Sequence, residues 1–276
     1  MASAKPGRRL IVTADDFGRS ASINAAVIQA HCEGILTCAS LMVNGDAFDE
    51  AVALAKANPK LGVGLHLALC CGKATLDADE IPDLVNDDGS LPHSAVAAGF
   101  AYYFSRGLRE QLRKEIAAQF QRFESTGLPC DHVNGHLHFH IHPTVLPLVI
   151  EEAKRHDIRA LRWTHPVKTE WKLGRGHWLY RRSHWMIFRT LSKRARPLRQ
   201  AEAIRSADRV FGLLEDSRVT EKFILNLLPE LPPGNSELYS HPSLDEFRHE
   251  YDALVSARVK QSIAEQGIEL IRYQDL

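Results

Sequence analysis

The sequence has no excess of either charge, no long apolar run and no paired cysteine motif. Its 276 residues carry 34 Lys and Arg against 34 Asp and Glu, so net charge gives no general attraction to nucleic acid. No stretch reaches the ~20 apolar residues that a membrane-spanning helix needs. The five cysteines form no CxxC pair, and their odd number argues against a disulfide framework and for a reducing compartment. Only about nine residues precede the first apolar stretch, so we expect no cleaved signal peptide and a cytoplasmic protein.

The sequence does contain a repeated alternation of apolar and amphipathic stretches. Short apolar stretches predict strands buried on both faces, and a 3.6-residue periodicity predicts helices. The expected strands cover residues 10–12, 35–43, 61–69, 131–133, 159–163, 237–239 and 268–271. The expected helices cover residues 23–33, 46–57, 108–126, 144–157, 223–228 and 244–266, whereas 72–103 has no clear pattern. Strands that alternate with helices form a parallel sheet covered by helices, so we expect one α/β domain over residues 1–276.

Two adjacent carboxylates, Asp15 and Asp16, follow the first apolar strand pattern in the motif TADDFG. Two carboxylates this close cannot both stay ionised in a water-poor site unless a cation or a proton offsets their repulsion. We therefore hypothesise a divalent metal held by one Asp and two His, with the other Asp free to act as a base. The alternative is an ordinary solvated turn after a strand.

Histidines supply the remaining candidate ligands. His66 ends the third expected strand, and His136, His138, His140 and His142 alternate in the run HLHFHIH. If the run is a strand, all four lie on one face, but a site that uses Asp16 and His66 has room for only one of them. At least two of the others then contact the substrate or support the ligands. His66 could instead be a hydrogen-bonded core histidine.

Reacting groups of parallel barrels gather at the carboxyl ends of the strands. Asp15, Asp16, His66, His136 and His241 all occupy such positions in the expected strand pattern. A bound metal would polarise a carbonyl, the second carboxylate could take a proton from water, and a histidine could protonate the leaving group. Arg162, in the expected strand 159–163, could face the substrate. His241 precedes Pro242 and could instead simply terminate a strand.

Four motifs together resemble the YdjC-like carbohydrate deacetylases. They are TADDFG, GLHL, DHVNGHLHFHIHP and the late SHP, and they span nearly the whole chain. The resemblance implies a distorted (β/α) barrel with a metal site at the carboxyl edge of its strands. It also implies removal of N-acetyl groups from amino sugars with one divalent ion, zinc or magnesium. By position it implies Asp16, His66 and His136 as ligands, Asp15 as base and His241 as acid.

This chain departs from the family pattern at two positions. Members with a diacetylchitobiose substrate have Asp where this chain has Asn134 and His where it has Leu137, so Asn134, His138 and His140 are expected to support the ligands or meet the substrate. The stretches LMVNGDAFDEAV and EIPDLVNDDG, Tyr102 to Phe104 and the closing GIELI are most similar to the hopanoid-biosynthesis branch. That similarity implies N-acetylglucosamine attached to a hopanoid lipid, with a soluble chitooligosaccharide as the alternative substrate.

A basic insertion at about residues 168–200 interrupts the alternation. Residues 168–199 hold ten Lys and Arg and one acidic residue, Glu170, together with Trp171, Trp178 and Trp185. The spacing predicts an amphipathic helix with one apolar stripe, formed by Tyr180, His184, Ile187, Phe188 and Leu191. The segment 171–196 is expected either to make peripheral contact with the inner membrane surface or to pack as a solvated helix. Nucleic acid is not expected, since it would leave the metal site without a purpose.

Two other functions are compatible with parts of this pattern. A metal-dependent sugar isomerase or phosphoesterase would use a similar barrel but more carboxylates or phosphate-binding glycines. A His-rich metal-binding protein at a membrane surface would need no catalysis, and the two adjacent aspartates would then be incidental. The sequence specifies neither the metal nor the oligomeric state.

Overall fold

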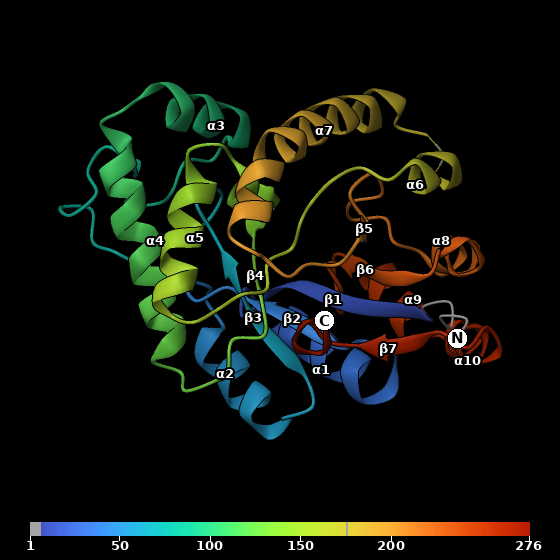
Figure 1. Ribbon diagram of the computed structural model, residues 1–276. Coiled ribbons are helices and arrows are strands. Elements are labelled where there is room, and N and C mark those ends of the chain that lie inside the picture. The colour runs from blue at the N-terminus through green and yellow to red at the C-terminus, as the bar shows by residue number, and fades with distance from the viewer. Residues whose placement is uncertain (1–6, 175) are drawn as a thin grey trace.

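The computed structural model describes residues 7–174 and 176–276, and its centre is a curled parallel sheet (Figure 1). In the described residues the strands are β1 (Arg8–Phe17), β2 (Cys38–Leu41), β3 (Gly62–Leu67), β4 (Val133–Gly135), β5 (Arg209–Phe211), β6 (Gly234–Ser240) and β7 (Glu269–Ile271). They follow the order β4-β3-β2-β1-β6-β5, and β7 pairs with the first half of β1. Every strand pair is parallel, as the alternation of strands and helices predicts.

Isolated β-bridges continue the curled sheet from β4 to β5. Val133 bridges Leu161, and Ala160 bridges Arg205, a few residues before β5 begins. The α/β fold is therefore a distorted barrel, as expected. The strand predicted at residues 159–163 is wrong in detail, because these residues make single bridges and no continuous ladder.

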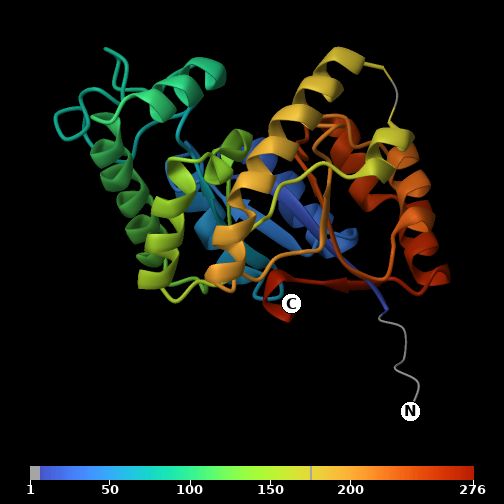
Figure 2. The same cartoon turned by 45° about the horizontal axis from the view of Figure 1, so that its top comes forward.

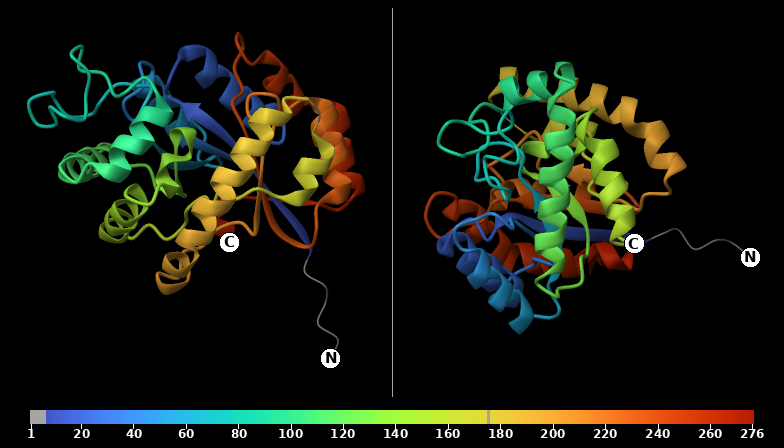
Figure 3. Two further views of the ribbon diagram at one scale, coloured as in Figure 1. Left: turned by 90° about the horizontal axis from the view of Figure 1, so that it is seen from above. Right: turned by 90° about the vertical axis from the view of Figure 1, so that its left-hand side faces the viewer.

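Helices cover the outside of the curled sheet. The α-helices are α1 (Ala21–Glu33), α2 (Phe48–Ala57), α3 (Ala95–Phe104), α4 (Leu108–Glu124), α5 (Val145–Arg155), α6 (Lys168–Leu173), α7 (Trp178–Ala201), α8 (Glu221–Leu227), α9 (Arg248–Val255) and α10 (Ala257–Glu265). Figure 2 shows that α3 (teal) and α7 (gold) project on the same side of the sheet. Figure 3 shows α1 and α2 (blue) on the side away from α7.

Local sequence explains the first strand and helix. Residues Leu10 to Ala14 are buried from both faces, which suits an apolar strand at the centre of a parallel sheet. Ser20 then caps α1, because its hydroxyl accepts a hydrogen bond from the backbone N–H of Ile23. The strand-to-helix connection after β1 is thus short, and it places the side chains that end β1 at the carboxyl edge of the sheet.

Two further predictions need correction. The stretch 72–103 was expected to lack regular structure, but α3 begins at Ala95; this helix contains no charged residue, so its sequence shows little amphipathic contrast. The helix predicted over 244–266 is two helices. Ser256 adopts a non-helical conformation between them and caps α10 through the backbone N–H of Val259. Among the described residues no helix is both long and apolar enough to cross a membrane.

Candidate active site

The end of β1 brings both carboxylates to the same edge of the sheet. Neighbouring side chains of a regular strand point to opposite faces. Here Asp16 has a φ of 64°, in the left-handed region, and the register between β1 and β2 shifts between Ala14 and Phe17. Such a bulge redirects a side chain, and backbone strain of this kind gathers at functional sites. Asp15 and Asp16 are both buried, so neither belongs to a solvated turn.

Asp16, His66 and His136 form a compact set of possible metal ligands, which we call the Asp–His–His group. One ligand atom from each residue lies within 4.8 Å of the other two. Asp16 Oδ1 is 3.2 Å from His66 Nε2 and 3.0 Å from His136 Nδ1. The three residues come from β1, the end of β3 and the residue after β4, and all three lie at the carboxyl edge of the sheet, where β2 separates β1 from β3.

The hydrogen bonds of His66 identify which of its nitrogens can bind a cation. Asn134 Nδ2 donates a hydrogen bond to the Asp15 carboxylate, so the amide oxygen of Asn134, Oδ1, faces His66 Nδ1 at 2.7 Å and accepts a hydrogen bond from it. A neutral His66 then has no proton on Nε2, which is buried and has no hydrogen-bond partner among the described residues. Its lone pair faces a carboxylate oxygen of Asp16. Two electron-rich atoms this close fit a bound cation, and a ligating histidine usually donates its other N–H in this way.

Asp15 is held by a different set of contacts. Arg162 Nη1 donates to its Oδ2 at 2.5 Å, and Arg162 Nη2 and Asn134 Nδ2 each donate to its Oδ1 at 3.0 Å. Burial alone would raise the pKa of Asp15, but the Arg162 guanidinium outweighs it, and the pKa lies far below its ordinary value. Asp15 therefore stays ionised. Arg162 is fully buried and contacts Asp15 from inside the barrel; it does not line the cavity described below.

His241 follows β6 and faces Asp15 and Asp16 from the other side of the site. Burial would lower its pKa, but the Asp216 carboxylate, whose Oδ1 is 3.6 Å from His241 Nδ1, and then Asp16 raise the pKa to about 9. His241 is thus protonated at neutral pH. Its Nδ1 is buried without a hydrogen-bond partner in the described part of the chain.

The histidine run is not a strand, so the prediction that its histidines share one face is wrong. Residues His136–Ile141 form a 3-10 turn in which Leu137 and His138 have φ values of 50° and 59°. The four side chains consequently have four different partners: Asp16 for His136, Tyr239 Oη for His138, the Arg162 carbonyl for His140 and the Gly99 carbonyl for His142. His138 and His142 line the cavity, whereas His140 is buried beneath it.

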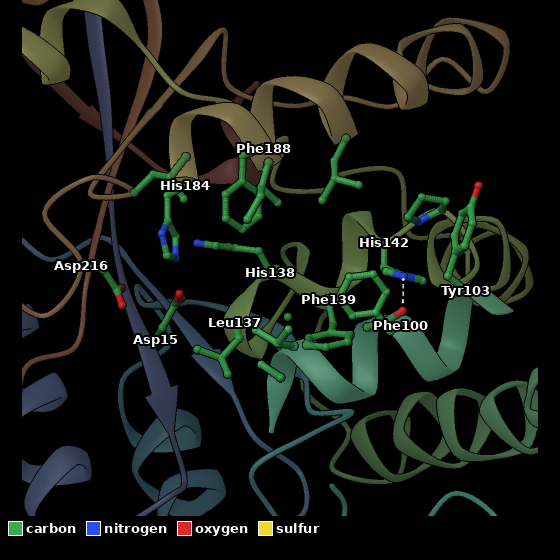
Figure 4. A pocket seen from close by; sticks show the side chains of 18 of the residues that line it. Asp15, Phe100, Tyr103, Leu137, His138, Phe139, His142, His184, Phe188 and Asp216 are labelled. Atoms are coloured by element: carbon green, nitrogen blue, oxygen red, sulfur yellow. Dashed lines mark hydrogen bonds between the residues drawn. The ribbon is translucent and has the colours of Figure 1, made fainter. Parts of the chain in front are cut away.

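A cavity of about 560 Å3 opens above Asp15, His66 and His241, between α3 and α7. Its walls are mostly apolar and aromatic and include Phe100, Tyr103, Phe104, Phe139, Ile187 and Phe188. Figure 4 shows Asp15 and Asp216 at one end of the cavity and Phe100 and Tyr103 at the other. The apolar stripe predicted for the basic helix is the face of α7 that lines this cavity.

Several residues of the site were missed by the sequence reasoning. Asp216 follows β5, a strand of three residues that gives no clear periodic signal. Glu237 lies on β6 inside an expected strand, and its Oε1 accepts hydrogen bonds from Arg162 Nε and Nη2 at 2.9 and 2.8 Å. A charged residue inside an otherwise buried strand was the one signal that could have identified it, because a buried carboxylate needs a partner.

Comparison with known proteins places this geometry in context. The sequence profile described as YdjC-like protein matches residues 9–265. A carbohydrate deacetylase of Brevibacillus brevis is 38% identical over 166 residues, which cover 60% of this chain. That stretch covers 61% of the relative, so the match spans about three fifths of its length.

Two other proteins match almost end to end. A chitooligosaccharide deacetylase of Proteus mirabilis is 27% identical over 285 residues, covering 97% of this chain and 98% of the relative. The crystal structure of an Enterococcus faecalis V583 protein, provisionally described as a cellobiose-phosphate cleavage protein, superposes with a TM-score of 0.76 at 25% identity. It covers 98% of both chains, and this confirms the α/β barrel.

Proposed function

The chain belongs to the YdjC-like protein family, and we propose that it is a metal-dependent hydrolase that removes the N-acetyl group from an N-acetylglucosamine unit. The observation that carries the proposal is the unpartnered Nε2 of His66, which faces the Asp16 carboxylate at the floor of the cavity. Next to it stand an ionised carboxylate, Asp15, and a protonated histidine, His241. A cation site flanked by a base and an acid is an arrangement that can hydrolyse an amide by metal-assisted attack of water.

The Asp–His–His group would hold the ion. Two imidazole nitrogens and one carboxylate favour zinc over magnesium, which prefers oxygen ligands and retained waters. Three protein ligands leave positions open, as in catalytic zinc sites. When bound, the ion would supply Lewis acidity that polarises the acetyl carbonyl and lowers the pKa of water.

The side chains around this site have complementary tasks. Asp15, held in one orientation by Arg162 and Asn134, takes the proton from the attacking water. A C–O bond forms at the acetyl carbon, the C–N bond breaks, and His241 gives its proton to the departing sugar nitrogen. The products are acetate and the free amine. His138 and Tyr239, which share a hydrogen bond of 2.9 Å, line the cavity next to the reacting groups and would contact the sugar.

The cavity walls favour a substrate with an apolar part, and we propose a lipid-linked amino sugar such as a hopanoid glycolipid. A free chitooligosaccharide carries hydroxyl groups along its whole length and has no extended apolar part, whereas the wall formed by α3 exposes Phe100 and Phe104 at 63% and 72%. Burying apolar surface contributes about 25 cal/mol per Å2, so a lipid portion on this wall would add substantially to binding. The Proteus relative, which matches over nearly its whole length, supports the soluble alternative, a chitooligosaccharide.

Peripheral contact with an anionic inner-membrane surface is the remaining part of the proposal. The exposed basic face of α7, formed by Arg182, Arg189 and Lys193, carries no acidic residue between its members. Arg181 of the same helix does not belong to this face, because it is buried and ion-paired with Glu215 at 3.2 Å. Arg175, another of the ten basic residues of this segment, lies outside the described residues. Each exposed basic residue near an anionic surface is worth about 1 kcal/mol.

The assay that tests the proposal measures acetate release from N-acetylglucosaminyl lipid and from diacetylchitobiose, with metal content measured in the same preparation. We expect activity on both and a higher kcat/KM on the lipid. Phe100→Ser should raise KM for the lipid and leave the chitobiose reaction unchanged, because only the lipid reaches α3. Leu270→Ser, an exposed apolar position remote from the cavity, is the matched control. No acetate from either substrate would contradict the deacetylase proposal, and equal effects of Phe100→Ser on both substrates would contradict the lipid substrate.

A further inference from the structure

The carboxyl-terminal turn η3 (Tyr273–Asp275) lies beneath the sheet and reaches Asp15 through buried hydrogen bonds. The first route starts at the hydroxyl of Tyr273, which donates a short hydrogen bond to Glu237 Oε2. Glu237 Oε1 accepts from Arg162 Nε and Nη2, and Arg162 donates to both oxygens of Asp15. Tyr273, Glu237 and Arg162 are all fully buried.

The donor in the first contact is unambiguous. Burial and then the Glu237 carboxylate raise the pKa of Tyr273 well above its ordinary value, so the hydroxyl keeps its proton. Oε2 of Glu237 accepts no other hydrogen bond from the described residues. Tyr273 therefore provides the contact that keeps one oxygen of this buried carboxylate satisfied while the other orients Arg162.

A second route leaves the same turn. The backbone N–H groups of Tyr273 and Gln274 donate to Asp131 at 3.3 and 2.9 Å. Asp131 Oδ2 lies 3.1 Å from His132 Nδ1, and the ring of Tyr273 stacks on His132 with centroids 4.4 Å apart. The turn thus fixes the imidazole of His132 both along its edge and across its face.

The second route continues to Asp15 and to His66. His132 Nε2 is 3.0 Å from Ser40 Oγ, and Asn134 Nδ2 donates to the same hydroxyl oxygen at 2.8 Å. The Asp131 carboxylate can only accept, so His132 Nδ1 donates to it, and in the neutral tautomer of His132 the free Nε2 accepts from Ser40 Oγ. Asn134 also contacts Asp15 Oδ1 and His66 Nδ1. In that tautomer Asn134 donates to Ser40, Ser40 donates to His132, and His132 donates to Asp131.

The same contacts argue against a second metal site formed by Cys38, Asp131 and His132 below the Asp–His–His group. Cys38, Asp131 and His132 are close enough together to suggest a second metal site. However, both nitrogens of His132 are engaged by protein groups, and Asp131 accepts two backbone N–H groups. The Cys38 thiol also has a protein partner, because its Sγ donates to Asp131 Oδ2 at 3.4 Å. Cys38, Asp131 and His132 therefore support the site around Asp15 and His66 through hydrogen bonds.

We propose that Tyr273 is a positioning residue for the carboxylate of Asp15, acting through Glu237 and Arg162, with the Asp131 to Asn134 chain as a second support from the same turn. The inference rests on the proposed function for its kinetic consequences only. Without the hydroxyl, Glu237 Oε2 is a buried acceptor without a donor, and the carboxylate rotates to find one. This rotation weakens the two hydrogen bonds by which Arg162 holds Asp15, and misplaced catalytic groups lower the rate of the chemical step.

The test compares Tyr273→Phe, which removes one oxygen and keeps the stacked ring, with Ser40→Ala, which interrupts the second route. We expect each to lower kcat about tenfold or more while KM and metal content stay near the wild-type values. Tyr251→Phe is the matched control, because this buried tyrosine also donates a hydrogen bond, to Gln29 Oε1 at 2.9 Å, but remote from the site. A merely structural role predicts that both tyrosine variants lower Tm and neither lowers kcat.

A second measurement makes no use of turnover. Hydrogen exchange at Arg162 Nε–H, followed by 15N NMR, should be slow in the wild type and faster in Tyr273→Phe, and unchanged in Tyr251→Phe. Wild-type kcat in Tyr273→Phe, a loss of bound metal in that variant, or unchanged exchange at Arg162 would each overturn the inference. If the wild-type protein released no acetate, the proposed function would fail, and the exchange measurement would still decide the role of Tyr273.

Discussion

Replacement of Arg162 by Met should destabilise the protein strongly, because it leaves two buried carboxylates without their cation. Arg162 makes four hydrogen bonds, two to Asp15 and two to Glu237, and all three side chains are shielded from solvent. Removing one partner of a buried ion pair costs about 3–5 kcal/mol. At about 2–4 °C per kcal/mol for a chain of this size, Tm should fall by roughly 6–20 °C. Differential scanning calorimetry at pH 7.5 measures the shift.

The pH dependence of the free energy of unfolding provides a second, independent test. In the wild type the depressed pKa of Asp15 stabilises the fold above the unfolded pKa of about 4, and this contribution is lost only as pH falls through the folded pKa. In Arg162→Met the strongest influence that lowers the pKa of Asp15 is gone, and only the weaker effects of His66 and His241 oppose burial, so the pKa of Asp15 rises relative to the wild type. The ionised carboxylate then costs more stability at high pH, and this cost decreases as Asp15 is protonated. The gap in stability between wild type and variant should therefore narrow between pH 7.5 and pH 5.

Arg159 supplies the matched control for this experiment. It pairs with Asp157 at the surface, with side chains 72% and 85% exposed, and such pairs contribute about 0–1 kcal/mol. Arg159→Met should therefore unfold at a Tm close to that of the wild type. The double variant Arg162→Met/Glu237→Gln should recover part of the Tm lost in Arg162→Met, because it removes one of the two buried carboxylates that lack a cation. An Arg162→Met variant as stable as Arg159→Met, or a gap that widens toward pH 5, would refute the reasoning.

Three further predictions concern metal, pH and membrane. Alanine at any member of the Asp–His–His group should remove the bound ion, whereas His138→Ala and His140→Ala should retain it. Metal analysis of the five variants tests this. If His138→Ala contained no metal and His136→Ala were fully loaded, the ligand assignment would be reversed. The rate of acetate release should fall as pH rises through about 9, where His241 loses its proton. The pH–rate profile of His241→Gln should lack this alkaline decrease. If the decrease persists, another residue is the acid. Gln at the basic face of α7 should abolish salt-sensitive sedimentation with anionic vesicles, unlike a variant neutralised on α10; equal wild-type binding to neutral vesicles would exclude the membrane contact.

The sequence reasoning succeeded where a single strand pattern placed a polar side chain. Asp15 and Asp16 end a buried strand, and His66 ends another, so parallel pairing brings them to the same edge of the sheet. The bulge at Asp16, which redirects its side chain, was not predicted. The basic helix was also recognisable, because its apolar stripe contrasts with charged neighbours. The helix α3 was missed for the same reason. Neither its buried nor its exposed side carries a charged residue, so its sequence shows no alternation of apolar and polar positions.

Other features could not be read from one segment. The alternation in the histidine run suggests a strand, but Leu137 and His138 adopt positive φ although neither is a glycine, and no local signal marks them. The supports of Asp15 come from distant segments: Ser40 on β2, Glu237 on β6 and Tyr273 near the carboxyl terminus. Their contacts depend on strand register and on the curl of the sheet, which a linear pattern does not specify.

The most direct test of the central claim compares wild type with Asp15→Asn on an N-acetylglucosaminyl substrate, with acetate release and bound metal measured in the same samples. If Asp15 is the base beside an ion held by the Asp–His–His group, the variant should keep its metal and lose acetate release by about 100-fold or more. The amide has the shape of the carboxylate, but its Nδ2 replaces an oxygen that accepts from Arg162 or Asn134, so the variant should be less stable than the wild type. A circular dichroism spectrum at the assay temperature shows whether the variant is folded. A variant that binds metal and releases acetate at the wild-type rate would contradict the account.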